Sequence, residues 1–159
     1  MPITDLSPLA EAPTAVHELT ITRIFDAPRE LVFRAWTEPD RAMRWWGPRG
    51  FTTAHYEIDF RSGGAYRVCM CSPEGTKHWQ RGVCRELVEP ERIVFTSAWE
   101  DKEGRPGHET VLTVDFVEYG AKTKLILHQA VFETVTARDL HQGGWASALE
   151  CLAEYLAQA

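Results

Sequence analysis

The sequence predicts an α+β domain in which a curved seven-stranded antiparallel sheet wraps around a long C-terminal helix. Between residues 52 and 131, apolar and polar residues alternate with the period of a β-strand. Near the C-terminus, apolar residues recur at helical steps of three and four, namely Ala148, Leu149, Leu152 and Leu156. Because the helices are too few to cover both faces of such a sheet, we expect its concave face to close around the last helix.

The N-terminal third predicts one strand followed by two short helices. Residues 16–25 alternate well enough for a strand, which ends before Asp26. Asp26 and Pro28 form a helix-start signal, with the Asp oxygen as a cap, so a helix is expected over 29–36. A second helix is expected over 40–46, where Gly47-Pro48 stops it.

Six further strands are expected between residues 52 and 131, because five turn-forming segments divide this stretch. The connections are too short for parallel crossovers, so the strands must be antiparallel. After Glu133 the pattern returns to that of a helix, and the Gly143-Gly144 pair marks either a bend in it or its start. The turns lie at residues 61–64, 72–75, 89–90, 101–107 and 118–121.

Length and composition predict a flexible N-terminal tail over 1–15 and a single domain over 16–159. The net charge of -6 argues against a nucleic-acid partner. No apolar run approaches the roughly 20 residues that cross a bilayer, and no export signal precedes the domain. We therefore expect a cytoplasmic protein, monomeric or homodimeric, that has no membrane partner.

No metal site, cofactor or catalytic residue is predicted. The side chains of His55, Glu57 and Asp59 share a strand face but are spaced about 7 Å apart, too far for one ion. Glu133 and His141 could form an acid–base pair, although a capping and surface role explains them as well.

Five segments of the chain carry a resemblance: APRELVFRAWTEPD, RWWGP, EIDFRSGGAYR, GVCRELVEPERIVFTSAW and HQGGWASALECLAEYL. In this order they resemble the single-domain homologues of the activator of Hsp90 ATPase, the AHSA1-like family of the SRPBCC or START-like (Bet v 1-like) superfamily. The similarity spans about residues 16–157. It implies a helix-grip fold and a hydrophobic cavity between the sheet and the C-terminal helix, for a lipid or polyketide-like ligand.

Strand parity, the helix stripe and the aromatic residues of the two short helices predict which side chains line that cavity. Parity is sensitive to a single bulge, which reverses the face. The Trp45-Trp46 pair is open to two interpretations, a hydrophobic latch or a ligand contact. The predicted lining is Phe33, Trp36, Trp45, Trp46, Tyr56, Ile58, Tyr66, Val68, Trp79, Phe95, Trp99, Leu112, Val114, Leu127, Trp145 and Leu149.

Three functions follow as hypotheses. The first is a carrier or sensor that binds an apolar or aromatic small molecule in the cavity. The second is an enzyme of the cyclase or hydrolase type that uses the same cavity. The third is a protein-interaction or stress-related module that uses a sheet edge or a Trp45-Trp46 surface. Hsp90 co-chaperone activity is not implied, because the N-terminal Hsp90-binding domain of the eukaryotic activator has no counterpart in this sequence.

Overall fold

The computed structural model describes residues 17–158, so the predicted tail over 1–15 lies outside the described residues. Seven strands form one sheet in the order β2-β8-β7-β6-β5-β4-β3, and every neighbouring pair is antiparallel. In chain order the elements are β2 (His17–Phe25), α2 (Arg29–Thr37), α3 (Pro39–Ala42), β3 (Thr52–Ile58), β4 (Ala65–Cys71), β5 (Lys77–Val88), β6 (Arg92–Trp99), β7 (Thr110–Tyr119), β8 (Lys122–Phe132) and α4 (Val135–Gln158).

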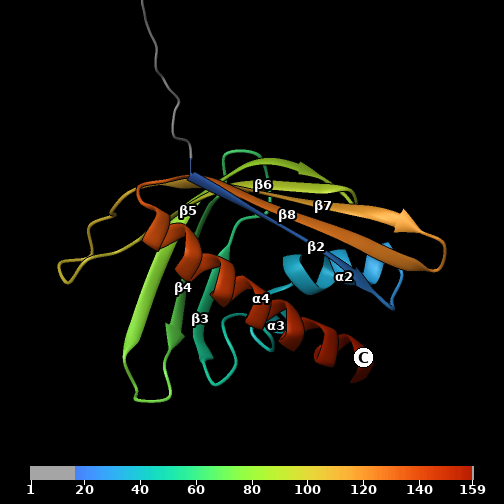
Figure 1. Cartoon of the computed structure of the whole chain (residues 1–159), viewed down its shortest axis with the longest axis horizontal. Coiled ribbons are helices and arrows are strands. Elements are labelled where there is room, and N and C mark those ends of the chain that lie inside the picture. Colours follow the sequence, from blue (N-terminus) through green and yellow to red (C-terminus); the bar gives the residue numbers. More distant parts are fainter. Residues whose placement is uncertain (1–16, 159) are drawn as a thin grey trace, which may run out of the picture.

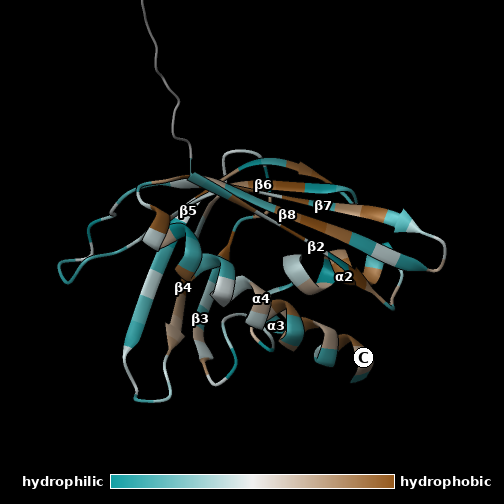
Figure 2. Ribbon diagram, viewed as in Figure 1, coloured by the Kyte–Doolittle hydropathy of each residue, from teal (hydrophilic) through white to brown (hydrophobic). Residues whose placement is uncertain are grey.

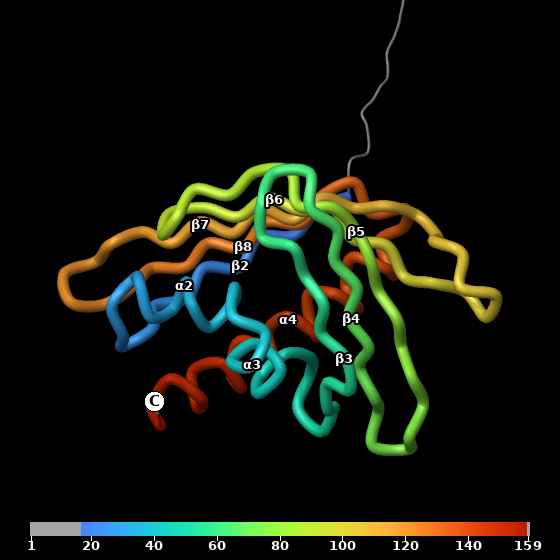
Figure 3. The backbone as a smooth tube through the Cα atoms, turned by 180° about the vertical axis from the view of Figure 1, so that it is seen from behind, coloured from blue at the N-terminus to red at the C-terminus, as the bar shows by residue number. Residues whose placement is uncertain are grey.

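The sheet is strongly curved, and α4 crosses its concave side together with α2 and α3 (Figures 1 and 3). The predicted fold class, a helix-grip with a curved seven-stranded sheet around a long C-terminal helix, is confirmed. Brown and teal alternate along the strands in Figure 2, as expected for a sheet with one buried face. The sheet is not closed, because β2 and β3 are both edge strands.

Three local predictions differ from the structure. The helix at Pro39 ends at Ala42 rather than at residue 46, because the chain turns before Gly47, whose φ is +96°. The start of α2 carries no side-chain cap, so the predicted Asp26 cap is wrong; the carbonyl oxygen of Pro28 accepts the first amides instead. Helix α4 begins at Val135, so it does not begin at the glycine pair.

The start of α4 is capped by Thr134, whose hydroxyl accepts the Ala137 amide at 3.0 Å. From there the stripe Ala148, Leu149, Leu152 and Leu156 is buried against the sheet. This stripe contacts the same core as the side chains of α2. Helix α4 therefore closes the concave face over its C-terminal half.

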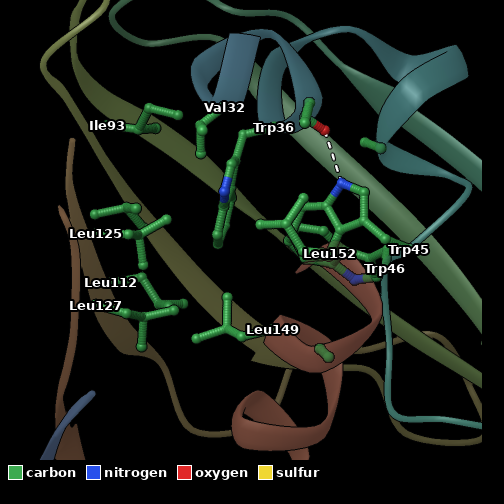
Figure 4. Packing of buried hydrophobic residues seen from close by; sticks show 14 of the residues in the cluster. Val32, Trp36, Trp45, Trp46, Ile93, Leu112, Leu125, Leu127, Leu149 and Leu152 are labelled. Atoms are coloured by element: carbon green, nitrogen blue, oxygen red, sulfur yellow. Dashed lines mark hydrogen bonds between the residues drawn. The ribbon is translucent and has the colours of Figure 1, made fainter. Parts of the chain in front are cut away.

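Trp36 lies at the centre of the core, at 1% exposure (Figure 4). Its ring packs edge-on against Trp45 and Trp46, with centroids 4.8 and 5.8 Å away, and stacks on Trp145 at 5.7 Å. The Trp45 indole N–H donates to the Ala35 carbonyl oxygen at 2.9 Å, the dashed line of Figure 4. Such aromatic contacts add stability beyond the burial of area, so this cluster stabilises the packing of α2 against Trp145 of α4.

Candidate ligand-binding pocket

A cavity of about 410 Å³ lies between α4 and the concave face of the sheet. Its volume falls in the range of small-molecule sites. It reaches the surface beside Leu140, which is 71% exposed. The lining is mainly apolar and comprises Trp46, Gly47, Pro48, Phe51, Met70, His78, Gln80, Ser97, Trp99, Leu112, Gln129, Leu140, His141, Gly144, Trp145 and Ala148.

The strand register explains how residues distant in sequence come together in the wall. Gln80 of β5 pairs with Val68 on one side and with Trp99 on the other. Directly paired residues present their side chains to the same face, so these three form one row across the concave side. In the same way Leu112 of β7 pairs with Gln129 of β8 and brings that amide into the wall.

Four of the sixteen predicted residues lie in this lining: Trp46, Trp99, Leu112 and Trp145. Five others, Trp36, Tyr56, Ile58, Tyr66 and Phe95, surround a second void of about 10 Å³, which also touches Trp46. Six more are packed in the core and line neither space, namely Phe33, Trp45, Val68, Val114, Leu127 and Leu149.

The prediction that Trp79 faces the concave side is wrong. Its neighbours His78 and Gln80 line the pocket, whereas the Trp79 ring lies 3.8 Å from the guanidinium of Arg67 and 5.6 Å from the ring of His55. A cation–π contact holds the indole on the convex face. Strand β5 buries Gln80 in the position that strand parity would otherwise give to its neighbour Trp79.

Trp45 and Trp46 each take one of the two roles that the sequence left open, the hydrophobic latch and the cavity wall. Trp45 is 2% exposed and belongs to the packed core, which is the latch, while Trp46 lies in the cavity wall. Adjacent residues near a helix end point in different directions, so one pair serves both purposes. Because both rings are buried, the proposed protein-binding surface at Trp45-Trp46 is wrong.

Several lining residues were missed, although parity alone contains the signal for some. Met70, Ser97 and Gln129 each stand two positions from a residue that was predicted to face the cavity. Hydrophobicity gives no signal for the two polar ones, because polar side chains are seldom buried. His78, Leu140 and His141 lie at the rim, whose position depends on how α4 crosses the sheet.

The indole N–H of each pocket tryptophan donates to a neutral side chain. Trp46 donates to Gln80 Oε1 at 3.0 Å, and Trp145 to Gln129 Oε1 at 2.8 Å. The two glutamines are 7% and 1% exposed. An indole N–H placed at a wall needs such an acceptor, so both amides fix the orientation of the rings.

His141 holds the third pocket tryptophan. The Trp99 indole N–H donates to His141 Nε2 at 2.9 Å, and His141 Nδ1 lies 2.7 Å from the Ala137 carbonyl oxygen. Because indole can only donate and a carbonyl can only accept, Nε2 must be bare and Nδ1 must carry the proton. These contacts therefore require the neutral form of His141.

Two tyrosines beside the 10 Å³ void are held uncharged. Burial raises the pKa of Tyr56 and of Tyr66, so both phenols stay protonated. Tyr56 donates to the Trp36 carbonyl oxygen at 3.0 Å. Among the described residues no hydrogen-bond partner reaches the Tyr66 hydroxyl or the Trp36 indole N–H, and both residues border the 10 Å³ void. A void of that size has room for about one water molecule.

Within residues 17–158 no three His, Cys, Asp or Glu side chains gather closely enough to hold a metal ion. His55, Glu57 and Asp59 are exposed on β3 and just after it, with His55 Nε2 3.5 Å from Glu57. The described part of the chain also contains no helix with both the length and the apolarity to cross a bilayer.

Solved structures of other proteins share this fold. The structure superimposes on an AHSA1 protein from Silicibacter pomeroyi with a TM-score of 0.84 and 26% identity, covering 89% of this chain and 99% of that one. A protein from Nitrosomonas europaea gives 0.76 and 28% over 89% and 94%, and one from Chromobacterium violaceum gives 0.78 and 27% over 87% and 96%.

No curated protein matches the sequence significantly. The family model described as activator of Hsp90 ATPase homolog 1-like protein matches residues 26–157, which is most of the chain. The protein is a member of that family, within the SRPBCC or Bet v 1-like superfamily.

Proposed function

We propose that this protein binds an apolar or aromatic small molecule in the cavity between α4 and the concave face of the sheet. The observation that carries the proposal is the 410 Å³ space itself, which is bordered by Trp46, Trp99, Leu112 and Trp145. Its fold is also that of a family of ligand-binding domains.

The pocket is preformed, which favours binding. Three hydrogen bonds hold the rings of Trp46, Trp99 and Trp145 in place without a ligand. A rigid site loses little entropy when it is occupied, so more of the contact energy appears as affinity. Apolar side chains that face a void also lack dispersion contacts that a ligand would restore.

The glycine pair of α4 offers a matched test of the site. Gly144 lines the cavity, with Pro48 3.8 Å from the position of an added Cβ, whereas nothing lies within 4 Å of a Cβ at Gly143. Gly144→Leu should fill the space and abolish binding, and Gly143→Leu should leave binding unchanged. Both variants remove a glycine from a helix interior, so both should gain up to about 1 kcal/mol of stability from helix propensity.

Binding is measured by titration with the uncharged fluorescent probe N-phenyl-1-naphthylamine, read through probe emission and tryptophan quenching. The expected result is saturable one-to-one binding to the wild type and to Gly143→Leu. If the wild type shows no saturable binding of this or any apolar probe in a lipid and polyketide panel, the proposal is wrong. If the Gly144→Leu variant binds the probe as tightly as the wild type does, the probe binds outside this cavity.

No specific observation on the described residues favours the other two hypotheses, an enzyme or a protein-interaction module. The pocket lining contains no carboxylate and no cysteine, and His141 uses both ring nitrogens in structural contacts.

A further inference from the structure

Two buried amides in the wall of the pocket have N–H groups that the described part of the protein leaves unused. Each glutamine oxygen already accepts an indole N–H, which forces the amide nitrogen to the other side of the group. Gln129 Nε2 donates to Thr110 Oγ1 at 2.8 Å, and Gln80 Nε2 approaches Ser97 Oγ at 3.5 Å.

Each amide nitrogen carries two hydrogens, and these contacts use one of them. The second hydrogen of Gln80 and of Gln129 has no acceptor among the described side chains. Thr110 accepts the first hydrogen of Gln129 and donates its own hydroxyl hydrogen to the Ser97 carbonyl oxygen. Each buried amide therefore keeps one unused N–H, which an oxygen of the ligand can accept.

The pocket also offers no charge to a ligand. Its described lining contains no Lys, Arg, Asp or Glu. His141 is neutral in its present contacts, and the other imidazole, His78, stands at the rim with its ring 6.4 Å from that of Trp99. An ionised group moved into such a space loses its hydration without compensation.

From these observations we propose that the ligand is an uncharged aromatic compound bearing a carbonyl or ether oxygen, which accepts an N–H from Gln80 or Gln129. Carboxylates and amines of the same carbon skeleton are disfavoured at the deep end of the pocket. This inference rests on the proposed function and specifies the class of ligand.

Three naphthalenes of similar size test the inference in the wild type. They are 2-acetylnaphthalene, which has an acceptor oxygen, 2-ethylnaphthalene, which lacks it, and 2-naphthoate, which is charged. Each competes with N-phenyl-1-naphthylamine at pH 8, above the range in which imidazole ordinarily titrates. The ketone should bind about 2- to 12-fold more tightly than the hydrocarbon, and the carboxylate about tenfold or more weakly than the ketone.

Gln80→Met tests the donor directly. Methionine has a similar volume and no N–H to offer, so the preference for the ketone over the hydrocarbon should fall or disappear. Gln142→Met is the control, because Gln142 is exposed on α4 outside the lining.

The outcomes separate the two proposals. If the probe binds the wild type but the three naphthalenes compete equally, or naphthoate competes best, the inference about ligand class is wrong and the binding function stands. If the probe does not bind, the binding function itself fails. The wild-type series decides the ligand class even if Gln80→Met does not fold.

Discussion

At the scale of single residues, hydrogen bonds to polar side chains fix the orientation of the tryptophan rings that line the pocket. Gln80, Gln129 and His141 each accept one indole N–H, and two of the three are nearly fully buried. A buried amide is stable only when its polar atoms are satisfied. The tryptophans bind the amide oxygens and leave an N–H of each glutamine unused, so the packing of the wall also sets its chemistry.

Trp145 and Trp45 should respond differently to truncation. Loss of a buried tryptophan typically costs about 3 to 5 kcal/mol. Trp145 borders the cavity, so part of its surface has no partner to lose, and Trp145→Ala should cost less than the top of that range while changing probe affinity. Trp45 is packed on all sides, so Trp45→Ala should cost more.

Urea unfolding and probe titration of the two variants check this order. A cost for Trp145→Ala equal to that of Trp45→Ala, with unchanged probe binding, would assign both rings to the packed core. No change in either measurement for Trp145→Ala would contradict the position of α4.

At the scale of elements, an ion cluster on the convex face joins β4, β5 and the end of β6. Glu100 accepts two hydrogen bonds from the Arg67 guanidinium, both at 2.8 Å, and its side chain is 3% exposed. The Arg81 Nε lies 3.6 Å from the same carboxylate. These contacts, with those of Arg67 first, lower the pKa of Glu100 from its ordinary value of 4.5.

Because the folded-state pKa is lowered, the stabilisation by Glu100 is complete above the ordinary value and is lost as the pH falls through the folded value. Glu100→Gln should lower the free energy of unfolding at pH 7 by about 1 kcal/mol, a low figure because solvent screens the half-exposed Arg67. Below the folded pKa the two proteins should converge.

Denaturant unfolding at a series of pH values measures this difference. Glu103→Gln is the matched control, because Glu103 pairs with Arg105 in full solvent, at 64% and 71% side-chain exposure. A difference between wild type and Glu100→Gln that stays constant down to pH 2 would contradict the assigned ion pairs.

At the scale of the whole molecule, α4 is the element that the curved sheet surrounds (Figures 1 and 3). Its buried stripe, Ala148, Leu149, Leu152 and Leu156, fills the concave side. A chain that ends before Gly144 would expose that face and should lose cooperative unfolding. A chain that ends at Leu156 retains the whole stripe and should unfold like the wild type. Calorimetry and near-UV circular dichroism distinguish these outcomes, and a soluble, cooperatively folded short chain would contradict the role given to α4.

The sequence by itself determined the seven strands and the terminal helix, because these depend on local signals. The five turn segments divide the six later strands, and the i, i+3, i+4 stripe identifies the buried side of α4. The curvature also followed, since too few helices are present to cover a flat sheet. For the site, the sequence located part of the aromatic wall, including Trp46, Trp99 and Trp145.

Only the tertiary structure decided which of two neighbours faces the cavity. At Trp79-Gln80 the tryptophan stacks under Arg67 outside, and the glutamine enters the wall to accept the N–H of Trp46, a residue 34 positions away. Hydrophobicity ranks the pair in the opposite order, because it carries no information about the distant partners that satisfy a buried amide or hold an exposed ring. The same non-local contacts leave the cavity its hydrogen-bond donors, which no local pattern in the sequence encodes.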